Sequence, residues 1–186
     1  MEVQTPPLDL DGTPVTSAAR LRSLAPLLAV AALVLLADQV SKAMIIAAIG
    51  RAAPTHSSVV LPGLLVFQYS ENTGTAFGMF HNAGWLLGVF ALAVVVGIVV
   101  MLPRLQQGTG SGRAQLVLTL GLVLGGALGN LLDRVAHGFV VDFILVPAAH
   151  LTLGNTGYQW PNFNIADSAI TIGMVLLVVR LFLEER

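Results

Sequence analysis

Four long apolar stretches, separated by polar segments, divide the chain. They cover residues 24–49, 84–102, 114–132 and 165–182. Each is close to the roughly 20 residues that a helix needs to cross a lipid bilayer. A single span in lipid has to be helical, because a lone strand would leave its backbone N–H and C=O groups unpaired. The pattern therefore predicts an all-α membrane bundle of four transmembrane helices.

Two of the connecting segments, residues 50–83 and 133–164, carry a different pattern. Short runs rich in β-branched and aromatic residues occur at 59–60 and 64–69, on either side of a Pro-Gly pair, and again at 140–144. Runs of this kind next to turn residues are typical of short β-strands. We expect them to pair into a small extracytoplasmic β-sheet platform.

The arginines in the polar segments predict the orientation of the spans. Five of them lie before the first span, between the second and third spans, and after the fourth, whereas the two alternate loops hold only Arg51 and Arg134. Basic residues concentrate on the cytoplasmic side, so both termini are expected there. Residues 1–23 are polar and lack helical periodicity. We expect them to form a disordered cytoplasmic tail before a membrane domain at 24–183.

Composition supports the membrane assignment and excludes several classes of chemistry. The chain has 186 residues, of which 55% are hydrophobic and 10% are charged, whereas soluble domains carry about 25% charged residues. It contains no cysteine, which excludes disulfides, thiol catalysis and thiolate metal sites. Its nine basic residues are scattered singly, so no nucleic-acid partner is expected.

The sequence pattern offers no metal or cofactor site. The histidines are dispersed without metal-ligand spacing, and no His-Glu-x-x-His pattern occurs. Ser41 is directly adjacent to Lys42 rather than spaced as a catalytic serine–lysine dyad. We therefore expect neither a metal ion nor a cofactor. The four histidines are His56, His81, His137 and His150.

Two aspartates at the edges of apolar segments are the main candidates for chemistry. Asp142 follows two valines in a strand-like run, and Asp167 stands near the start of the fourth span. Acids are costly beside a hydrocarbon layer, so their presence there indicates function. Two carboxylates that share one proton can act as acid and base on a water molecule. We therefore predict that Asp142 and Asp167 form a catalytic pair.

Asp167 also has a purely structural interpretation. Asn164 and Asp167 have the spacing of a capping box, in which the two residues satisfy backbone N–H groups at a helix start. A carboxylate in the first helical turn also complements the helix dipole. On the local sequence alone, the structural and catalytic interpretations are equally good. No comparable local reason explains Asp142.

Polar residues at the outer ends of the first and third spans could support such a site. Asp38 and Lys42 are four residues apart, so they share a helix face and can form an ion pair. This pair either fixes the first span or supports the site. Arg134 either reaches toward the interface with Asp133 as its partner, or helps to organise the site together with Asn130.

Small residues interrupt the third apolar span. Gly125, Gly126 and Gly129 have the three- and four-residue spacing that lets helix backbones approach closely. We expect this helix to pack tightly against its neighbours.

Four short motifs occur in order along the chain and point to a known family. They are Asp-Gln-Val-Ser-Lys at 38–42, Asn-Thr-Gly-Thr-Ala-Phe at 72–77, a segment at 126–143 that ends in Val-Asp-Phe, and Phe-Asn-Ile-Ala-Asp at 163–167. Together they resemble the lipoprotein signal peptidase, or signal peptidase II, family. One motif alone would be weak, but four in register over residues 25 to 183 make the resemblance specific.

The resemblance implies a bacterial inner-membrane aspartic endopeptidase with four transmembrane helices, a small outer β-structure and no cofactor. Enzymes of this family remove the signal peptide from prolipoproteins and cut before a cysteine that carries diacylglycerol. Globomycin-type inhibitors occupy their active site. By resemblance, the catalytic pair would be Asp142 and Asp167, placed at the outer face of the cytoplasmic membrane and in contact with membrane lipid.

The resemblance also implies roles for four neighbouring polar residues. Asn72 would point at the bound peptide. Asn130 and Arg134 would organise the site and contact the substrate. Asn164 would cap the fourth span and hydrogen-bond Asp167 or the substrate.

Two other classes of protein stay open on the residues alone. A small proton- or ion-conducting membrane subunit would use Asp38, Lys42 and Asp167 as relay groups, although the sequence shows no inverted repeat of the kind found in transporters. A non-catalytic membrane assembly factor would tolerate asparagine in place of both Asp142 and Asp167.

Overall fold

The computed structural model describes residues 17–50, 57–74, 89, 92–94, 96–98, 110–147, 150–153 and 156–184. The predicted second span, 84–102, is therefore described only in part, and each described residue in it is helical. Residues 1–16 of the predicted tail lie outside the described residues.

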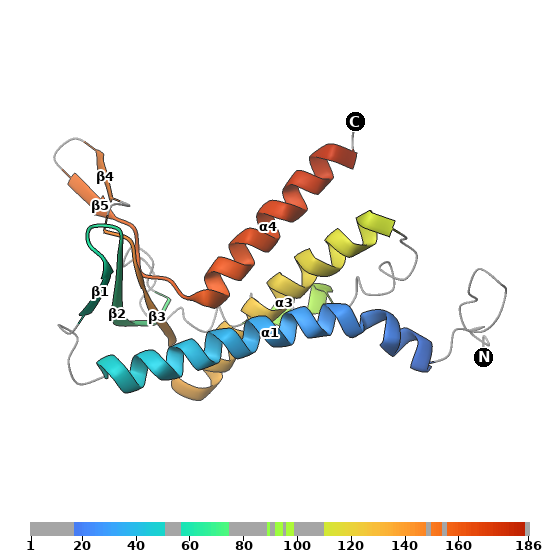
Figure 1. Ribbon diagram of the computed structural model, residues 1–186, viewed down its shortest axis with the longest axis horizontal. Helices are drawn as coiled ribbons and strands as arrows, with labels where there is room; N and C mark the ends of the chain where they lie inside the picture. Colours follow the sequence, from blue (N-terminus) through green and yellow to red (C-terminus); the bar gives the residue numbers. More distant parts are fainter. Residues whose placement is uncertain are drawn as a thin grey trace.

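Three long helices make up most of the described chain (Figure 1). α1 covers Ser17–Ile49, α3 covers Gly110–His137 and α4 covers Ile165–Glu184. α3 packs against both α1 and α4. Within the described residues, Leu24–Ile49 and Gly112–His137 are long and apolar enough to cross a membrane.

The helices begin and end at different residues from the predicted spans. α1 begins at Ser17, so residues 17–23 are helical and the prediction that they belong to a disordered tail is wrong. This segment is rich in alanine, leucine and arginine, which favour helices. Hydropathy marks where a chain enters lipid, not where its helix begins. α3 extends beyond the predicted third span, 114–132, at both ends for the same reason.

A small antiparallel sheet stands across one end of the helices (Figure 1). Its strands follow the order β1 (Ser57–Leu61), β2 (Leu65–Asn72) and β3 (Val140–Leu145). Gly63 in the turn between β1 and β2 has a φ of 74°, a left-handed conformation that favours glycine. The predicted small sheet is confirmed.

β3 connects the sheet to the start of α4. Ser70 on β2 is directly opposite Asp142 on β3. Beyond Asp142, backbone hydrogen bonds join Ile144 of β3 to Phe163, two residues before α4 begins. These bonds bring the first turn of α4 next to Asp142.

A second hairpin lies between β3 and α4. It consists of β4 (His150–Leu153) and β5 (Thr156–Gln159). It is not among the predicted elements, although the Gly-Asn pair at 154–155 is a typical two-residue turn signal between strands.

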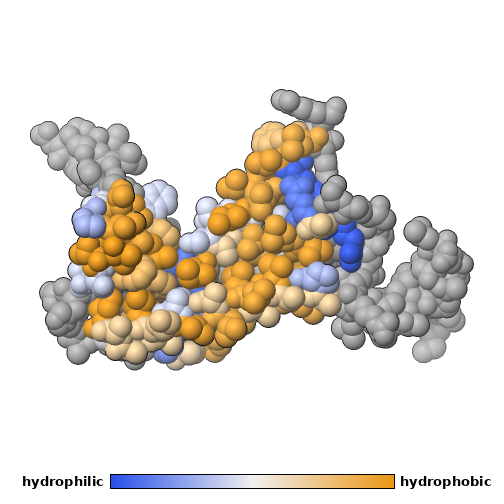
Figure 2. Space-filling view, viewed as in Figure 1, coloured by the Kyte–Doolittle hydropathy of each residue, from blue (hydrophilic) through white to orange (hydrophobic). Residues whose placement is uncertain are grey.

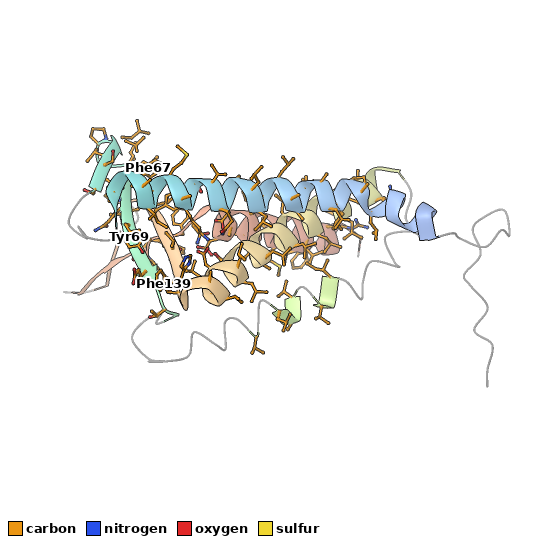
Figure 3. The ribbon with its side chains drawn as sticks, turned by 90° about the horizontal axis from the view of Figure 1, so that it is seen from below. Phe67, Tyr69 and Phe139 are labelled. Atoms are coloured by element: carbon orange, nitrogen blue, oxygen red, sulfur yellow. The ribbon has the colours of Figure 1, made fainter. Side chains whose placement is uncertain are left out.

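Apolar side chains form two buried clusters. One lies between α1 and α3. The other joins the sheet to the C-terminal end of α1, where Tyr69 and Phe143 pack in the same cluster as Ile45. Figure 3 shows Phe67, Tyr69 and Phe139 gathered at this junction. The sheet is therefore fixed to α1 by a core of its own.

The outer surfaces of the helices are largely apolar (Figure 2). Leu33 and Met44 on α1 are 67% and 66% exposed, and Phe182 on α4 is 67% exposed. Extended exposed apolar surface marks a contact with membrane or with another protein.

Glycines allow α3 to approach both neighbouring helices. A Cβ atom on Gly125 would lie 2.6 Å from the carbonyl oxygen of Ala31 on α1, and one on Gly126 would lie 2.5 Å from that of Ala166 on α4. A Cβ atom on Gly129 would also lie too close to a neighbour. The predicted close packing through these three glycines is confirmed.

We expect Gly125→Ala to destabilise the protein, because the new methyl group would overlap Ala31 and Val34 of α1. Forcing an extra methyl group into packed structure costs about 1–3 kcal/mol. The loss is measurable as a lower midpoint of thermal unfolding in detergent. Gly97→Ala is the control, because no atom of the described residues lies within 4 Å of a Cβ there. Equal losses in both variants would contradict the packing argument.

Candidate active site

Eight polar residues singled out in the sequence meet in one connected network where the helices reach the sheet. They come from three helices and two strands. α1 supplies Asp38 and Lys42, β2 supplies Asn72, α3 supplies Asn130 and Arg134, β3 supplies Asp142, and the start of α4 supplies Asn164 and Asp167.

Asp142 is buried and both of its carboxylate oxygens accept hydrogen bonds. Nδ2 of Asn164 donates to Oδ1 at 2.7 Å, and Nδ2 of Asn72 donates to Oδ2 at 2.9 Å. The backbone N–H of Gly74 donates to Oδ1 of Asn72 at 2.9 Å, which turns the NH₂ group of Asn72 toward Asp142. The strand end of β2 therefore positions a donor for the acid on β3.

Asp167 takes part in the predicted capping box, which is confirmed. Its backbone N–H donates to Oδ1 of Asn164 at 2.9 Å, and its Oδ2 accepts from the backbone N–H of Asn164 at 3.2 Å. Its other oxygen, Oδ1, accepts from Nδ2 of Asn130 at 2.7 Å. Asp167 thus caps α4 with one oxygen and faces the network with the other, so the structural and functional interpretations are compatible.

The two carboxylates influence each other electrostatically. Burial, followed by the nearby negative charge of Asp167, raises the pKa of Asp142 from 3.8 to about 7. Hydrogen bonds from Asn72 and Asn164 and the charge of Lys42 act in the opposite direction. A carboxyl group with this pKa can hold a proton near neutral pH beside an ionised partner. The arrangement can therefore supply one acid and one base.

Buried ion pairs lie directly behind the two acids. Nζ of Lys42 lies 2.7 Å from Oδ2 of Asp38 and 2.9 Å from Oδ2 of Asp133. The predicted pair between Asp38 and Lys42 is confirmed. Oδ1 of Asp38 accepts from the backbone N–H of Ala166, so this pair also holds the first turn of α4. Asp38 and Lys42 therefore fix the first helix and support the site at once.

One of the two interpretations of Arg134 paired it with Asp133, but Asp133 makes its ion pair with Lys42. Its Oδ2 also accepts from the backbone N–H of Val141 at 3.0 Å, and its Oδ1 accepts from Nε2 of Gln39 at 3.0 Å. Sequence reasoning gave Gln39 and Asp133 no part in the site. The three-residue spacing from Asn130 to Asp133, which places both on one face of α3, was the available signal.

Arg134 lies on the same side of α3 as the acids. Its NH1 donates to the backbone carbonyl of Asn130 at 3.1 Å. The carboxylates of Asp167, Asp142 and Asp133 all attract its guanidinium group electrostatically. A cation in this place can balance negative charge beside the two acids.

No metal site accompanies these acids in the part of the chain that the structure describes. No group of three or more His, Asp or Glu side chains there could hold a metal ion. The side chains of His56, His81 and His150 lie outside the described residues, and His137 stacks on Phe139.

Solved structures of bacterial membrane enzymes share this fold. Two of them, determined at 2.3 and 1.9 Å resolution by the in meso method, each align with a TM-score of 0.67 and 30% sequence identity. The alignments cover 86% and 83% of this chain, and 88% and 91% of theirs. The fold is therefore one that bacterial membrane enzymes have.

A sequence model of the signal peptidase II family matches residues 30–183. The lipoprotein signal peptidases of Symbiobacterium thermophilum and Pseudomonas aeruginosa are 42% and 39% identical to the chain over 132 and 165 residues. These alignments cover 70% and 87% of this chain, and 80% and 90% of the two relatives. The chain belongs to the signal peptidase II family and is a peptidase.

These matches do not favour the alternative of an ion-conducting subunit. The contacts of the suggested relay groups also argue against ion conduction. Asp38 and Lys42, two of the suggested relay groups, are buried in an ion pair with each other.

The raised pKa of Asp142 predicts a pH-dependent stability. Between about pH 4 and 7 the native protein holds a proton that the unfolded chain releases, so this group stabilises the fold at low pH and stops doing so as the pH rises through about 7. Asp142→Asn removes this titration. The difference in unfolding free energy between wild type and variant should shift against the wild type by roughly 1–3 kcal/mol between about pH 5 and 8. A difference that is constant, or that shifts the other way, would contradict the buried pair.

Proposed function

We propose that this chain is a membrane aspartic endopeptidase in which Asp142 and Asp167 are the catalytic pair. It removes the signal peptide from prolipoproteins, as the names of its relatives indicate for those proteins. The observation that carries the proposal is the joint hydrogen bonding of both acids to Asn164. Nδ2 of Asn164 donates to Asp142, and its backbone N–H donates to Asp167.

The proposed reaction uses one water molecule and one shared proton. The ionised aspartate takes a proton from the water, whose oxygen forms a bond to the scissile carbonyl carbon. The protonated aspartate donates its proton to the carbonyl oxygen. When the C–N bond breaks, a proton passes to the leaving nitrogen, which releases a carboxyl terminus and an amine. The pair then holds one proton again.

The neighbouring polar groups would bind the peptide backbone and steady the acids. Asn72 and Asn130 each donate to one aspartate. Asn72 ends β2, and Asn130 lies in the C-terminal part of α3. Arg134 places a cation beside the pair. In the proposal, these three residues contact the peptide backbone of the substrate next to the two acids.

The substrate is a signal peptide attached to a cysteine that carries diacylglycerol, and the cut falls before that cysteine. Figure 2 shows the molecule hollowed between the sheet and α4, with apolar side chains on both walls. The exposed apolar residues Leu61 and Leu64 beside the β1–β2 turn, and Ile172 and Val175 on α4, support a groove that accepts lipid chains. A globomycin-type inhibitor would occupy the same groove.

The proposed placement puts this groove at the outer face of a bacterial cytoplasmic membrane, with both termini in the cytoplasm. α1, α3, α4 and the segment 84–102 would each cross the bilayer. The sheet would then lie at headgroup level, where a diacylglyceryl group holds the cleavage site. This placement follows the arginine distribution and the apolar helix surfaces.

We expect Asp142→Asn and Asp167→Asn each to lower kcat/KM by about 10²–10⁴-fold or more, because each removes one partner of the acid–base pair. The assay mixes purified protein in detergent with a diacylglyceryl-modified prolipoprotein, and mass spectrometry locates the cut. Glu71→Gln is the control, because Glu71 is an exposed carboxylate on β2. Substantial turnover by Asp167→Asn, with the same cleavage site, would remove Asp167 from the proposal.

A further inference from the structure

The three side-chain amides that touch the aspartates are oriented in different ways. Asn72 and Asn164 each turn their Oδ1 toward a backbone N–H, that of Gly74 and of Asp167 respectively. A backbone donor cannot reverse, so these two amides keep their NH₂ groups pointing at the acids. The amide of Asn130 has no backbone donor of this kind among its described contacts.

Asn130 is instead oriented by side chains. Nζ of Lys42 donates to its Oδ1 at 3.3 Å, and Nδ2 of Asn164 donates to the same atom at 3.2 Å. The N–H groups of Asn164 are also directed at Asp142 Oδ1, at 2.7 Å, and at the carbonyl of Val141, at 3.3 Å. Lys42 is thus the charged donor on Asn130, and a charged donor makes the stronger hydrogen bond.

A lysine ammonium has three N–H donors and no acceptor. The described contacts of Nζ use all three, on Asp38, Asp133 and Asn130, and the side chain is only 3% exposed. If the amide of Asn130 were reversed, its NH₂ group would face this ammonium, donor against donor. Its oxygen would then face Oδ1 of Asp167, which Nδ2 now approaches at 2.7 Å.

The direction of this amide decides which form of Asp167 it favours. An NH₂ group that donates to a carboxylate favours the ionised acid, whereas a carbonyl oxygen in the same place favours the protonated acid. We infer that Lys42 acts through Asn130 as a positioning residue that keeps Asp167 ionised and places the shared proton of the pair on Asp142. This inference rests on the proposed function of the two aspartates.

Other charges surround Asp167 and are part of the same balance. Lys42 and Asp38 face it from α1, Arg134 faces it from α3 and Asp142 faces it from β3. Removing Lys42 alone would therefore change the net charge as well as the amide direction. Lys42→Met/Asp133→Asn removes one positive and one negative charge, so the net charge of the Asp38, Lys42 and Asp133 cluster is unchanged.

A kinetic cycle between Lys42 and Asn130 tests whether one acts through the other. We expect Lys42→Met/Asp133→Asn to lower kcat by about tenfold or more and to leave KM within about threefold of wild type, whereas Asp133→Asn alone loses less. In an Asn130→Ala background that already carries Asp133→Asn, adding Lys42→Met should cost no further activity. If it costs the same factor with and without Asn130, Lys42 acts only through the fold and the inference is wrong.

The position of the proton can be measured without turnover, by the infrared band of a protonated carboxyl group near neutral pH. In the wild type, Asp142→Asn should abolish the band that belongs to the pair. In the charge-matched Lys42→Met/Asp133→Asn background, the band should survive Asp142→Asn and disappear with Asp167→Asn instead. A band that follows Asp142 in both backgrounds overturns the inference.

The two experiments separate failure of the inference from failure of the proposed function. A wild type that cleaves no lipid-modified prolipoprotein would refute the proposed function, while the infrared comparison would still report where the proton lies. The thermal unfolding midpoint of each variant is compared with that of Asp133→Asn. Similar midpoints show that the loss of kcat occurs in folded protein.

Discussion

Two carboxylates, one buried and one partly buried, are held next to each other where each alone would be costly. Taking an acid out of water is unfavourable unless hydrogen bonds and charges compensate for it. Here the compensation comes from amide donors: Asn72 and Asn164 donate to Asp142, and Asn130 donates to Asp167. These donors do not fully offset the effects of burial and of the nearby charge of Asp167, so the pKa of Asp142 stays near 7. A pKa in this range lets a pair of acids share one proton at neutral pH.

The rest of the fold serves to place these donors. α3 can bring Asn130 and Asp133 to the site only because glycines on the same helix let α1 and α4 come close. A Cβ atom on Gly129 would lie 2.6 Å from Oδ2 of Asp38, so the smallest side chain is needed beside the ion pair itself. The hydrogen bond from the backbone N–H of Val141 to the carboxylate of Asp133 then ties β3, and with it Asp142, to the C-terminal part of α3.

Much of this arrangement can be predicted from the sequence because the signals are local. The capping box of Asn164 and Asp167 and the ion pair of Asp38 and Lys42 depend on residues three and four apart, and both are confirmed. The interpretation that paired Asp133 with Arg134, one of the two left open, does not hold, because the ion pair of Asp133 joins two helices that lie far apart in the sequence. No local pattern states which faces of two helices will meet, so the role of Gln39 was missed for the same reason.

The pH dependence of kcat/KM for a diacylglyceryl-modified prolipoprotein tests the central claim, that the two acids work as a pair holding one proton. The account predicts a bell-shaped profile between about pH 5 and 9, because activity is lost when the pair holds two protons and again when it holds none. The fall at high pH should have its midpoint near the pKa of Asp142, which is about 7 in the free protein. Activity that rises steadily up to about pH 9 would be typical of a base with a higher pKa and would contradict the account.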